Sequence, residues 1–152
     1  MKNSKRIVCN NTKETEKFGL ALGSKLKGSD VICLNGDLGA GKTTLTKSIG
    51  KGMGIDDYIT SPTFNIINEY YSDLNLYHFD TYRLENVDDV EYLGFDEYFY
   101  SDGVCIIEWA NRIKEFLPDQ YLELNIKKID DDKREIELVA FGDRPAEILE
   151  EI

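Results

Sequence analysis

The residues with the clearest chemistry lie in the stretch NGDLGAGKTTLTKS, residues 35–48. Gly36 is followed by four residues and then by Gly41, Lys42 and Thr43, which is the spacing of a phosphate-binding P-loop. Glycines in such a loop let the main chain approach the phosphates, and amide N–H groups converge on them at the start of a helix. The lysine contacts the β- and γ-phosphates, and the threonine hydroxyl binds Mg²⁺. The pattern predicts a nucleotide site, with a turn that binds no ligand as the alternative.

The residues around this loop support a nucleotide site and favour ATP. Residues 31–34 form a continuous apolar run just before the loop, which is typical of a strand buried on both faces. The segment TTLTKSIGKGM, residues 43–53, can form a helix, so the loop joins a strand to a helix as a P-loop requires. The chain contains no Asn-Lys-x-Asp element of the kind that GTPases use for guanine. We therefore expect ATP with Mg²⁺. The side chains that bind its adenine base cannot be identified from a sequence motif.

A carboxylate at the end of a neighbouring strand is expected as a further contact to Mg²⁺. The segment VCIIE ends in Glu108 after an unbroken apolar run, as a central parallel strand does. The segment LYHFD ends in Asp80 and alternates, which places His78, Asp80 and Tyr82 on one face. We assign Glu108 to Mg²⁺ and place Asp80 beside it, orienting the attacking water or sensing the γ-phosphate. Asp80, Glu108 and Lys42 are thus the expected catalytic residues, and an ion pair between Asp80 and an arginine is the alternative for Asp80.

Three further residue types near these motifs have more than one interpretation. His78 is the only histidine of the chain, and a hydrogen-bonded structural role suits it as well as a catalytic one. Trp109 follows Glu108 and suits the core, a lid or a contact with a partner. In TSPTF, residues 60–64, Thr63 or Ser61 could close onto the γ-phosphate and Mg²⁺ as in nucleotide switches, although Ser-Pro is also a common turn dipeptide.

Hydrophobic periodicity predicts elements along the whole chain, which we interpret as one domain covering residues 1–152. Asn11 and Thr12 offer a cap for the first helix, with Glu14 placed as in a capping box. The predicted elements are a strand at 7–9, a helix at 13–27, a strand at 31–34, the loop helix, a hairpin of strands at 65–71 and 75–82, a mostly helical segment at 86–100, a strand at 104–107, a helix from 110 that stops at Pro118, and two strands around 122–126 and 136–138. Strands interleaved with helices predict an α/β fold, a three-layer sandwich of the P-loop NTPase type with a mostly parallel sheet and antiparallel additions.

Composition limits the class of protein and its partners. The 152 residues are 41% hydrophobic, which suits a folded core rather than disorder. We expect no membrane span and no signal peptide, because no apolar stretch is long enough for either. Three sparse cysteines in apolar runs indicate buried, reduced thiols in a cytoplasmic protein. A net charge of −11 argues against direct nucleic-acid binding, since neutralising phosphates requires Lys and Arg.

The motifs NGDLGAGKTTLT, SPTF, HFDTYRL and IEWANR, in this order and at compatible spacing, resemble the TsaE family, also called YjeE. This family is the P-loop ATPase of bacterial tRNA threonylcarbamoyladenosine biosynthesis, and the resemblance covers nearly the whole chain. It implies a protein that acts with the TsaB–TsaD pair, in which TsaD modifies adenosine 37 of tRNA. The ATPase would hydrolyse ATP slowly alone, be stimulated by these partners and permit their repeated turnover. It would meet tRNA only through the complex.

The resemblance also implies roles for particular residues. Thr43 and Glu108 would hold Mg²⁺, Asp80 would be required for hydrolysis, and Thr12 and Arg134 would close over the nucleotide. The loop residues that would bind the triphosphate are Asp37, Leu38, Gly39, Ala40, Gly41, Lys42, Thr43 and Thr44. The switch or partner-facing residues would be Ser61, Pro62, Thr63, His78, Tyr82, Arg83 and Trp109. The tail after Phe141 matches no pattern that we can name.

Two other functional classes share the P-loop. A small-molecule kinase normally needs an arginine-bearing lid to hold the transferred charge, and the five arginines of this chain are scattered rather than clustered. A nucleotide-dependent binding module would show no useful hydrolysis. Hydrolysis that is slow alone and rises with a partner separates the predicted ATPase from both.

Overall fold

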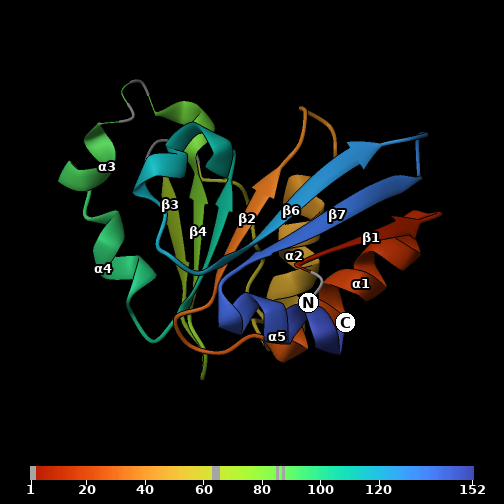
Figure 1. Cartoon of the computed structure of the whole chain (residues 1–152), viewed down its shortest axis with the longest axis horizontal. Helices are drawn as coiled ribbons and strands as arrows, with labels where there is room; N and C mark the ends of the chain where they lie inside the picture. Colours follow the sequence, from red (N-terminus) through yellow and green to blue (C-terminus); the bar gives the residue numbers. More distant parts are fainter. Residues whose placement is uncertain (1–2, 63–65, 85, 87) are drawn as a thin grey trace.

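The fold is built on one mixed seven-stranded β-sheet (Figure 1). The computed structural model describes residues 3–62, 66–84, 86 and 88–152, apart from the side chain of Arg83. The strand order is β1-β7-β6-β2-β5-β4-β3. The strands are β1 (Ser4–Cys9), β2 (Val31–Asn35), β3 (Ile67–Tyr70), β4 (Leu76–Asp80), β5 (Val104–Glu108), β6 (Tyr121–Lys128) and β7 (Arg134–Phe141).

The centre of the sheet is parallel and its edges are antiparallel. Strands β6, β2, β5 and β4 run parallel to one another, while β7 and β1 extend one edge and β3 extends the other as antiparallel partners. Burial explains the apolar runs of β2 and β5, because central parallel strands are covered on both faces. The predicted mostly parallel sheet with antiparallel additions is therefore confirmed.

Helices cover both faces of the sheet and make three layers (Figure 1). One face carries α1 (Thr12–Lys25), α2 (Lys42–Gly52) and α5 (Asp143–Glu151), and the other carries α3 (Asp89–Tyr92), α4 (Phe95–Phe99) and the 3₁₀ helices η1 (Thr81–Arg83) and η2 (Ala110–Phe116). The side chains of β2 alternate between the two cores: Ile32 and Leu34 pack toward α2, whereas Val31 and Cys33 pack toward α4. None of these helices, within the described ranges, has the length and apolar character needed to span a membrane.

Close packing of α1 on α2 fixes the helix that begins at the phosphate loop. A β-carbon added to Gly23 would lie 2.1 Å from the carbonyl oxygen of Ile49, and one added to Gly19 would lie 2.4 Å from the Cβ of Ser48. Glycine at these positions of α1 therefore permits a helix contact that any side chain would prevent. The loop helix is held against α1 as well as against the sheet.

The predicted elements are present, with four corrections. The strand predicted at 75–82 is β4, which ends at Asp80, so Tyr82 lies in the 3₁₀ helix η1 and not on a strand face with His78 and Asp80. The cap of α1 is Asn11, whose Oδ1 accepts from the Glu14 amide at 2.9 Å, so Thr12 is the first helical residue rather than the cap. The segment 110–116 is a 3₁₀ helix instead of an α-helix, with non-helical backbone at Ile113. The tail that matched no pattern forms α5, which Arg144 joins to the sheet through two 3.0 Å bonds to the buried Asp30 carboxylate.

The three cysteines are free and buried, as their apolar surroundings predicted. Cys33 and Cys105 lie on adjacent central strands. Burial raises the pKa of both thiols well above the usual value. These thiols are therefore core side chains rather than nucleophiles.

Candidate nucleotide-binding site

The P-loop joins β2 to α2 in the predicted strand–loop–helix order. Gly39 and Gly41 have φ angles of 81° and 105°, a region that side chains disfavour. Gly41 is the N-cap of α2, and the Ala40 amide closes the loop by donating to the Asp37 carbonyl at 3.0 Å. The glycines thus wrap the main chain around the N-terminus of α2, where the helix dipole favours an anion.

A cavity of about 730 Å³ opens in front of this loop, a size typical of small-molecule sites. It is lined by Leu38, Gly39, Gly41, Lys42, Thr43, Thr44, Ser61, Asp80, Tyr82, Glu108, Trp109 and Arg134. The structure therefore brings together residues from the loop, the segment after α2, the ends of β4 and β5, and the β6–β7 hairpin. Most of the site residues predicted from sequence face this cavity.

Lys42 lies at the base of the cavity and is 5% exposed. Its Nζ donates to the carbonyls of Gly36 and Asp37 at 2.6 and 2.9 Å and lies 4.2 Å from the centroid of the Trp109 ring. Burial lowers the pKa of Lys42, while the negative charges of Glu108, Asp80 and Asp37 act in the opposite direction. The ammonium group therefore sits among acceptors and acidic groups at the centre of the site.

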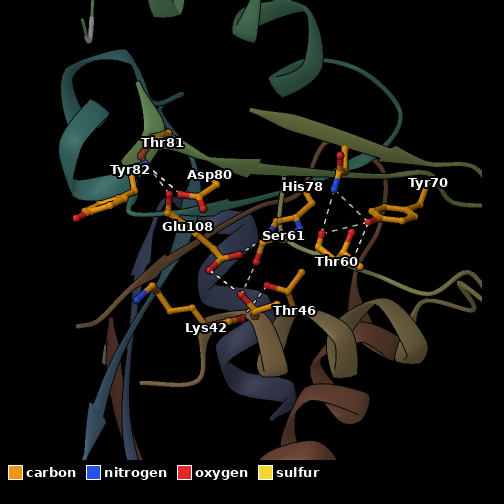
Figure 2. Close-up of polar contacts among 12 residues, drawn as sticks. Lys42, Thr46, Thr60, Ser61, Tyr70, His78, Asp80, Thr81, Tyr82 and Glu108 are labelled. Carbon is orange, nitrogen blue, oxygen red and sulfur yellow. Dashed lines mark hydrogen bonds and ion pairs between the residues drawn. The ribbon is translucent and has the colours of Figure 1, made fainter. Parts of the chain in front are cut away.

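The two predicted carboxylates lie side by side because β4 and β5 are parallel neighbours. Asp80 and Glu108 are register partners at the ends of these strands, and both side chains are buried. Glu108 Oε1 lies 3.4 Å from Thr43 Oγ1, which in turn lies 2.8 Å from Ser61 Oγ. The side chains of Glu108 and Ser61 are labelled in Figure 2. Asp80 caps η1 by accepting from the Tyr82 amide at 3.1 Å.

These residues fit a Mg²⁺ ion that arrives with a nucleotide. Mg²⁺ prefers oxygen ligands and usually binds through one or two protein groups together with substrate phosphates. Thr43 and Glu108 supply a hydroxyl and a carboxylate oxygen close together at the N-terminus of α2. Among the described residues, no cluster of three or more His, Cys, Asp or Glu side chains could hold a metal by itself. The donor set is that of a shared protein–phosphate site rather than a dedicated protein cage.

His78 lies behind the carboxylates instead of in the cavity. It is fully buried, and its Nε2 forms a short contact with Glu108 Oε2. A hydrogen-bonded position within the core was one of its two interpretations. The second site motif thus contributes Asp80 to the cavity wall and His78 to the support of Glu108.

Trp109 adopts a left-handed backbone conformation, with φ 61° and ψ 36°. This conformation is costly outside glycine and is found where the surrounding structure enforces it. Its ring contacts Lys42 on one side and stacks at a tilt with Tyr82, with 4.9 Å between the ring centroids. Trp109 therefore forms the cavity wall beside the loop lysine.

Thr81 and Arg112, whose roles were not predicted from the sequence, stabilise this wall of the cavity. Thr81 Oγ1 donates to the carbonyls of Glu108 and Trp109, the first at 3.1 Å. Arg112 donates to three carbonyls of the η1 segment, including that of Tyr82 at 2.8 Å. The chain after β4 is thereby tied to the chain after β5. Both residues belong to the motifs HFDTYRL and IEWANR, which was the only signal that could have identified them.

A smaller cavity of about 90 Å³ adjoins the first and shares Gly41, Thr44 and Arg134 with it. The rest of its lining comes from α1, the loop and the β6–β7 hairpin: Thr12, Thr15, Ala40, Leu45, Ile126, Asp132 and Ile136. Arg134 is anchored by donating from Nε to the Ala40 carbonyl at 2.7 Å. Thr12 and Arg134 were expected to lie over the nucleotide. Thr15, Ile126 and Ile136 were not predicted, because apolar and threonine side chains within helices and strands belong to no recognisable motif.

Some predicted residues lie elsewhere. Pro62 is buried and lines neither cavity, and Asp37 is exposed at the tip of the loop. Thr63 and the side chain of Arg83 lie outside the described residues, so their assignments remain predictions. The functional roles given to the other site residues also remain predictions at this point.

Comparison with known proteins agrees with this architecture. Residues 9–136 match the family model described as "Threonylcarbamoyl adenosine biosynthesis protein TsaE". The tRNA threonylcarbamoyladenosine biosynthesis protein TsaE of Bacillus subtilis strain 168 is 48% identical over 93% of this chain and 89% of its own length. The protein of the same name from Treponema pallidum strain Nichols is 38% identical over 86% of this chain and 97% of its own.

The fold is similar to that of a solved structure. The crystal structure of YdiB from Bacillus subtilis matches with a TM-score of 0.82 and 42% identity, covering 99% of this chain and 95% of YdiB. The family match spans the P-loop, both carboxylate-bearing strands, the whole of β6 and the start of β7. The chain therefore belongs to the TsaE family.

Proposed function

We propose that this protein binds ATP with Mg²⁺ and hydrolyses it slowly in the absence of partners. The observation that carries the proposal is the convergence on one cavity of the P-loop, Thr43, Glu108 and Asp80. The loop amides and Lys42 bind the β- and γ-phosphates, and Thr43 and Glu108 hold Mg²⁺. Held by Thr43 and Glu108, Mg²⁺ would supply positive charge that offsets the charge of the phosphates.

Asp80 is positioned for the attacking water. It lies one strand away from Glu108 at the same level of the sheet and borders the same cavity. A carboxylate there accepts a hydrogen bond from water and orients it toward the γ-phosphate. Asp80 therefore contributes mainly to turnover, while Lys42 contributes mainly to affinity.

The smaller cavity takes the adenine base. It adjoins the loop on the side away from the carboxylates, and the side chains of Ile126, Ile136 and Leu45 give it apolar walls. Aliphatic side chains suit the faces of a purine ring, and the nearby Thr12 and Thr15 supply polar edges. This placement lays the nucleotide along the groove from Glu108 to Thr12.

We place this ATPase in tRNA threonylcarbamoyladenosine biosynthesis, acting with TsaB and TsaD. The names of its relatives support the pathway, and the motif resemblance supports the partners. ATP hydrolysis would permit repeated turnover of the partner complex, and this chain would not transfer the threonylcarbamoyl group itself.

The charge distribution supports contact with tRNA only through partners. Residues 52–111 contain 13 Asp and Glu residues and one arginine, a net charge of −12, whereas the rest of the chain contains 16 acidic and 17 basic residues. The acidic segment includes β3, β4, α3, α4 and β5. It would repel an RNA backbone, which is bound by Lys and Arg.

The arginines near the site do not favour a kinase. Arg112 and Arg134 both donate to backbone carbonyls, which fixes them as supports of the cavity wall. A kinase lid needs arginines that can close on the transferred phosphoryl group. Hydrolysis is therefore the reaction that the described side chains support best.

The decisive experiment measures phosphate release by the purified chain, alone and with the TsaB–TsaD complex, with the Asp80→Asn chain as the matched control. We expect slow release alone, a rise of at least about 10-fold with the complex, and no rise with the control. Modified tRNA formed per complex should exceed one only when the wild-type chain and ATP are present. A slow rate of phosphate release that does not change when the complex is added would be consistent with the nucleotide site but would refute the assigned pathway.

A further inference from the structure

The buried histidine of β4 has no role in the proposed hydrolysis, yet its contact reaches the metal-binding carboxylate. His78 is 0% exposed, and its Nε2 contacts Glu108 Oε2. The proposed Mg²⁺ role needs Glu108 as a carboxylate, which only accepts hydrogen bonds, so the tautomer of His78 that supports this role donates from Nε2. Among the described residues, Nδ1 has no hydrogen-bond partner. The hydrogen bonding of this ring within the described chain is therefore directed at Glu108.

The two oxygens of Glu108 have different surroundings. Oε2 contacts His78 (Figure 2), while Oε1 lies 3.4 Å from Thr43 Oγ1 on the cavity side. The terminal torsion of a glutamate is broad, so the carboxylate plane is not fixed by its own rotamer preferences. A donor on one oxygen fixes that plane and leaves the other oxygen facing Thr43.

The sheet register explains how one strand supports the carboxylate of the next. Asp80 pairs with Glu108, and His78 lies two residues earlier on β4, on the same face as Asp80. The Glu108 side chain reaches the imidazole of His78 on the neighbouring strand (Figure 2).

We infer that His78 is a positioning residue that orients Glu108 so that Oε1 is presented to Mg²⁺ together with Thr43. The inference rests on the Mg²⁺ role proposed above. Groups that hydrogen-bond to a metal ligand typically change metal affinity about 10- to 100-fold when removed. His78 therefore controls the Mg²⁺ requirement of nucleotide binding rather than nucleotide binding as such.

The test measures the affinity for a non-hydrolysable ATP analogue by calorimetry across a Mg²⁺ series. For His78→Leu, which removes the donor, we expect the half-saturating Mg²⁺ concentration to rise about 10-fold, with metal-free affinity within about 2-fold of wild type. His78→Gln, whose amide can donate toward Glu108, should recover most of the change. Phe79→Leu is the matched control, because Phe79 is equally buried on the same strand but faces the opposite core. It should lower the melting temperature and leave the Mg²⁺ requirement unchanged.

The outcomes separate the inference from the function on which it rests. A folded His78→Leu chain with an unchanged Mg²⁺ requirement would overturn the positioning role, and so would an equal loss of affinity with and without Mg²⁺. If the affinity of the wild-type chain for the ATP analogue did not depend on Mg²⁺, the metal would have no place in the proposed function, and the inference about His78 would be refuted as well. If His78→Leu fails to fold, His78→Gln and His78→Asn decide. The shorter asparagine should not reach Glu108, so equal Mg²⁺ requirements for the two would contradict the inference.

Discussion

The two ends of the nucleotide groove are built in different ways. The phosphate end comes from one continuous loop and from the ends of two neighbouring strands, and it concentrates charged and hydroxyl groups such as Lys42, Thr43 and Glu108. The base end comes from α1, the loop and the β6–β7 hairpin, and its walls are aliphatic side chains and threonines such as Thr15 and Ile136. Among the residues that the structure describes, Gly41, Thr44 and Arg134 border both ends.

This difference reflects what each end must recognise. Phosphates are bound by main-chain amides, a helix N-terminus and fixed charges, which a short motif can supply. A purine is bound by shape and apolar contact, which any group of segments at the right distance can supply. In the proposed function, binding at the phosphate end would therefore depend on particular atoms, whereas binding at the base end would depend on the volume of the cavity.

The largest expected effect is at the loop lysine. Lys42→Ala should lower the affinity for ATP about 200-fold, or about 3 kcal/mol, because a charge-assisted phosphate contact is lost in a buried place. The affinity for tripolyphosphate should fall by a similar factor. Lys47→Ala on the same helix is the control, since Lys47 lies over the Tyr58 ring and lines neither cavity. Calorimetry that finds ATP affinity unchanged in Lys42→Ala would refute the site.

The next effect separates turnover from binding within the phosphate end. Asp80→Asn keeps an oxygen that can accept from the Tyr82 amide but removes the charge that orients water. We expect partner-stimulated hydrolysis to fall about 100-fold, with ATP affinity within about 2-fold of wild type because the role proposed for Asp80 is to orient water and not to bind the phosphates. Phosphate release and calorimetry on the same preparation give both numbers. If Asp80→Asn instead lost ATP binding but kept its turnover per bound ATP, Asp80 would be assigned to Mg²⁺ and Glu108 to the attacking water.

The metal carboxylate should show a smaller, ion-specific effect. Glu108→Ala should raise the Mg²⁺ concentration needed for tight ATP binding about 30-fold, because one of two protein oxygens near the ion is lost. Titration of Mg²⁺ at fixed nucleotide measures it, with Glu123→Ala on β6 as a control outside both cavities. An unchanged Mg²⁺ requirement would exclude Glu108 from the metal shell.

The smallest effect tests the base end. Thr12→Trp should fill the smaller cavity from its exposed rim and lower ATP affinity about 10-fold, because the apolar volume for the base is lost. Tripolyphosphate should bind as before, unlike in Lys42→Ala. Lys13→Trp, one residue along and outside the cavity, controls for an added surface tryptophan. A tripolyphosphate affinity that falls as much as ATP affinity would show that the two ends do not act separately.

Much of the fold and the phosphate end could be predicted from sequence because their signals are local. The apolar runs 31–34 and 104–107 identified the two strands at the centre of the sheet, and the glycine spacing identified the loop between β2 and α2. The 3₁₀ form of η2 could not be predicted, since its periodicity resembles that of an α-helix over so few residues. Helix α5 carried no recognised motif and is held by a distant partner, Asp30.

The sequence by itself determined which groups are available: a phosphate loop, a lysine, a threonine and two carboxylates, each at the end of a predicted strand. Only the tertiary structure decided how these groups are arranged in space. The parallel pairing of β4 with β5 set Asp80 beside Glu108, and the fold brought Thr12 to the same cavity as Arg134. The physical reason is the separation of the interacting residues along the chain. A motif consists of residues that are close in sequence, whereas the orientation of side chains and the volume of an apolar cavity arise from packing between segments that are far apart in the chain.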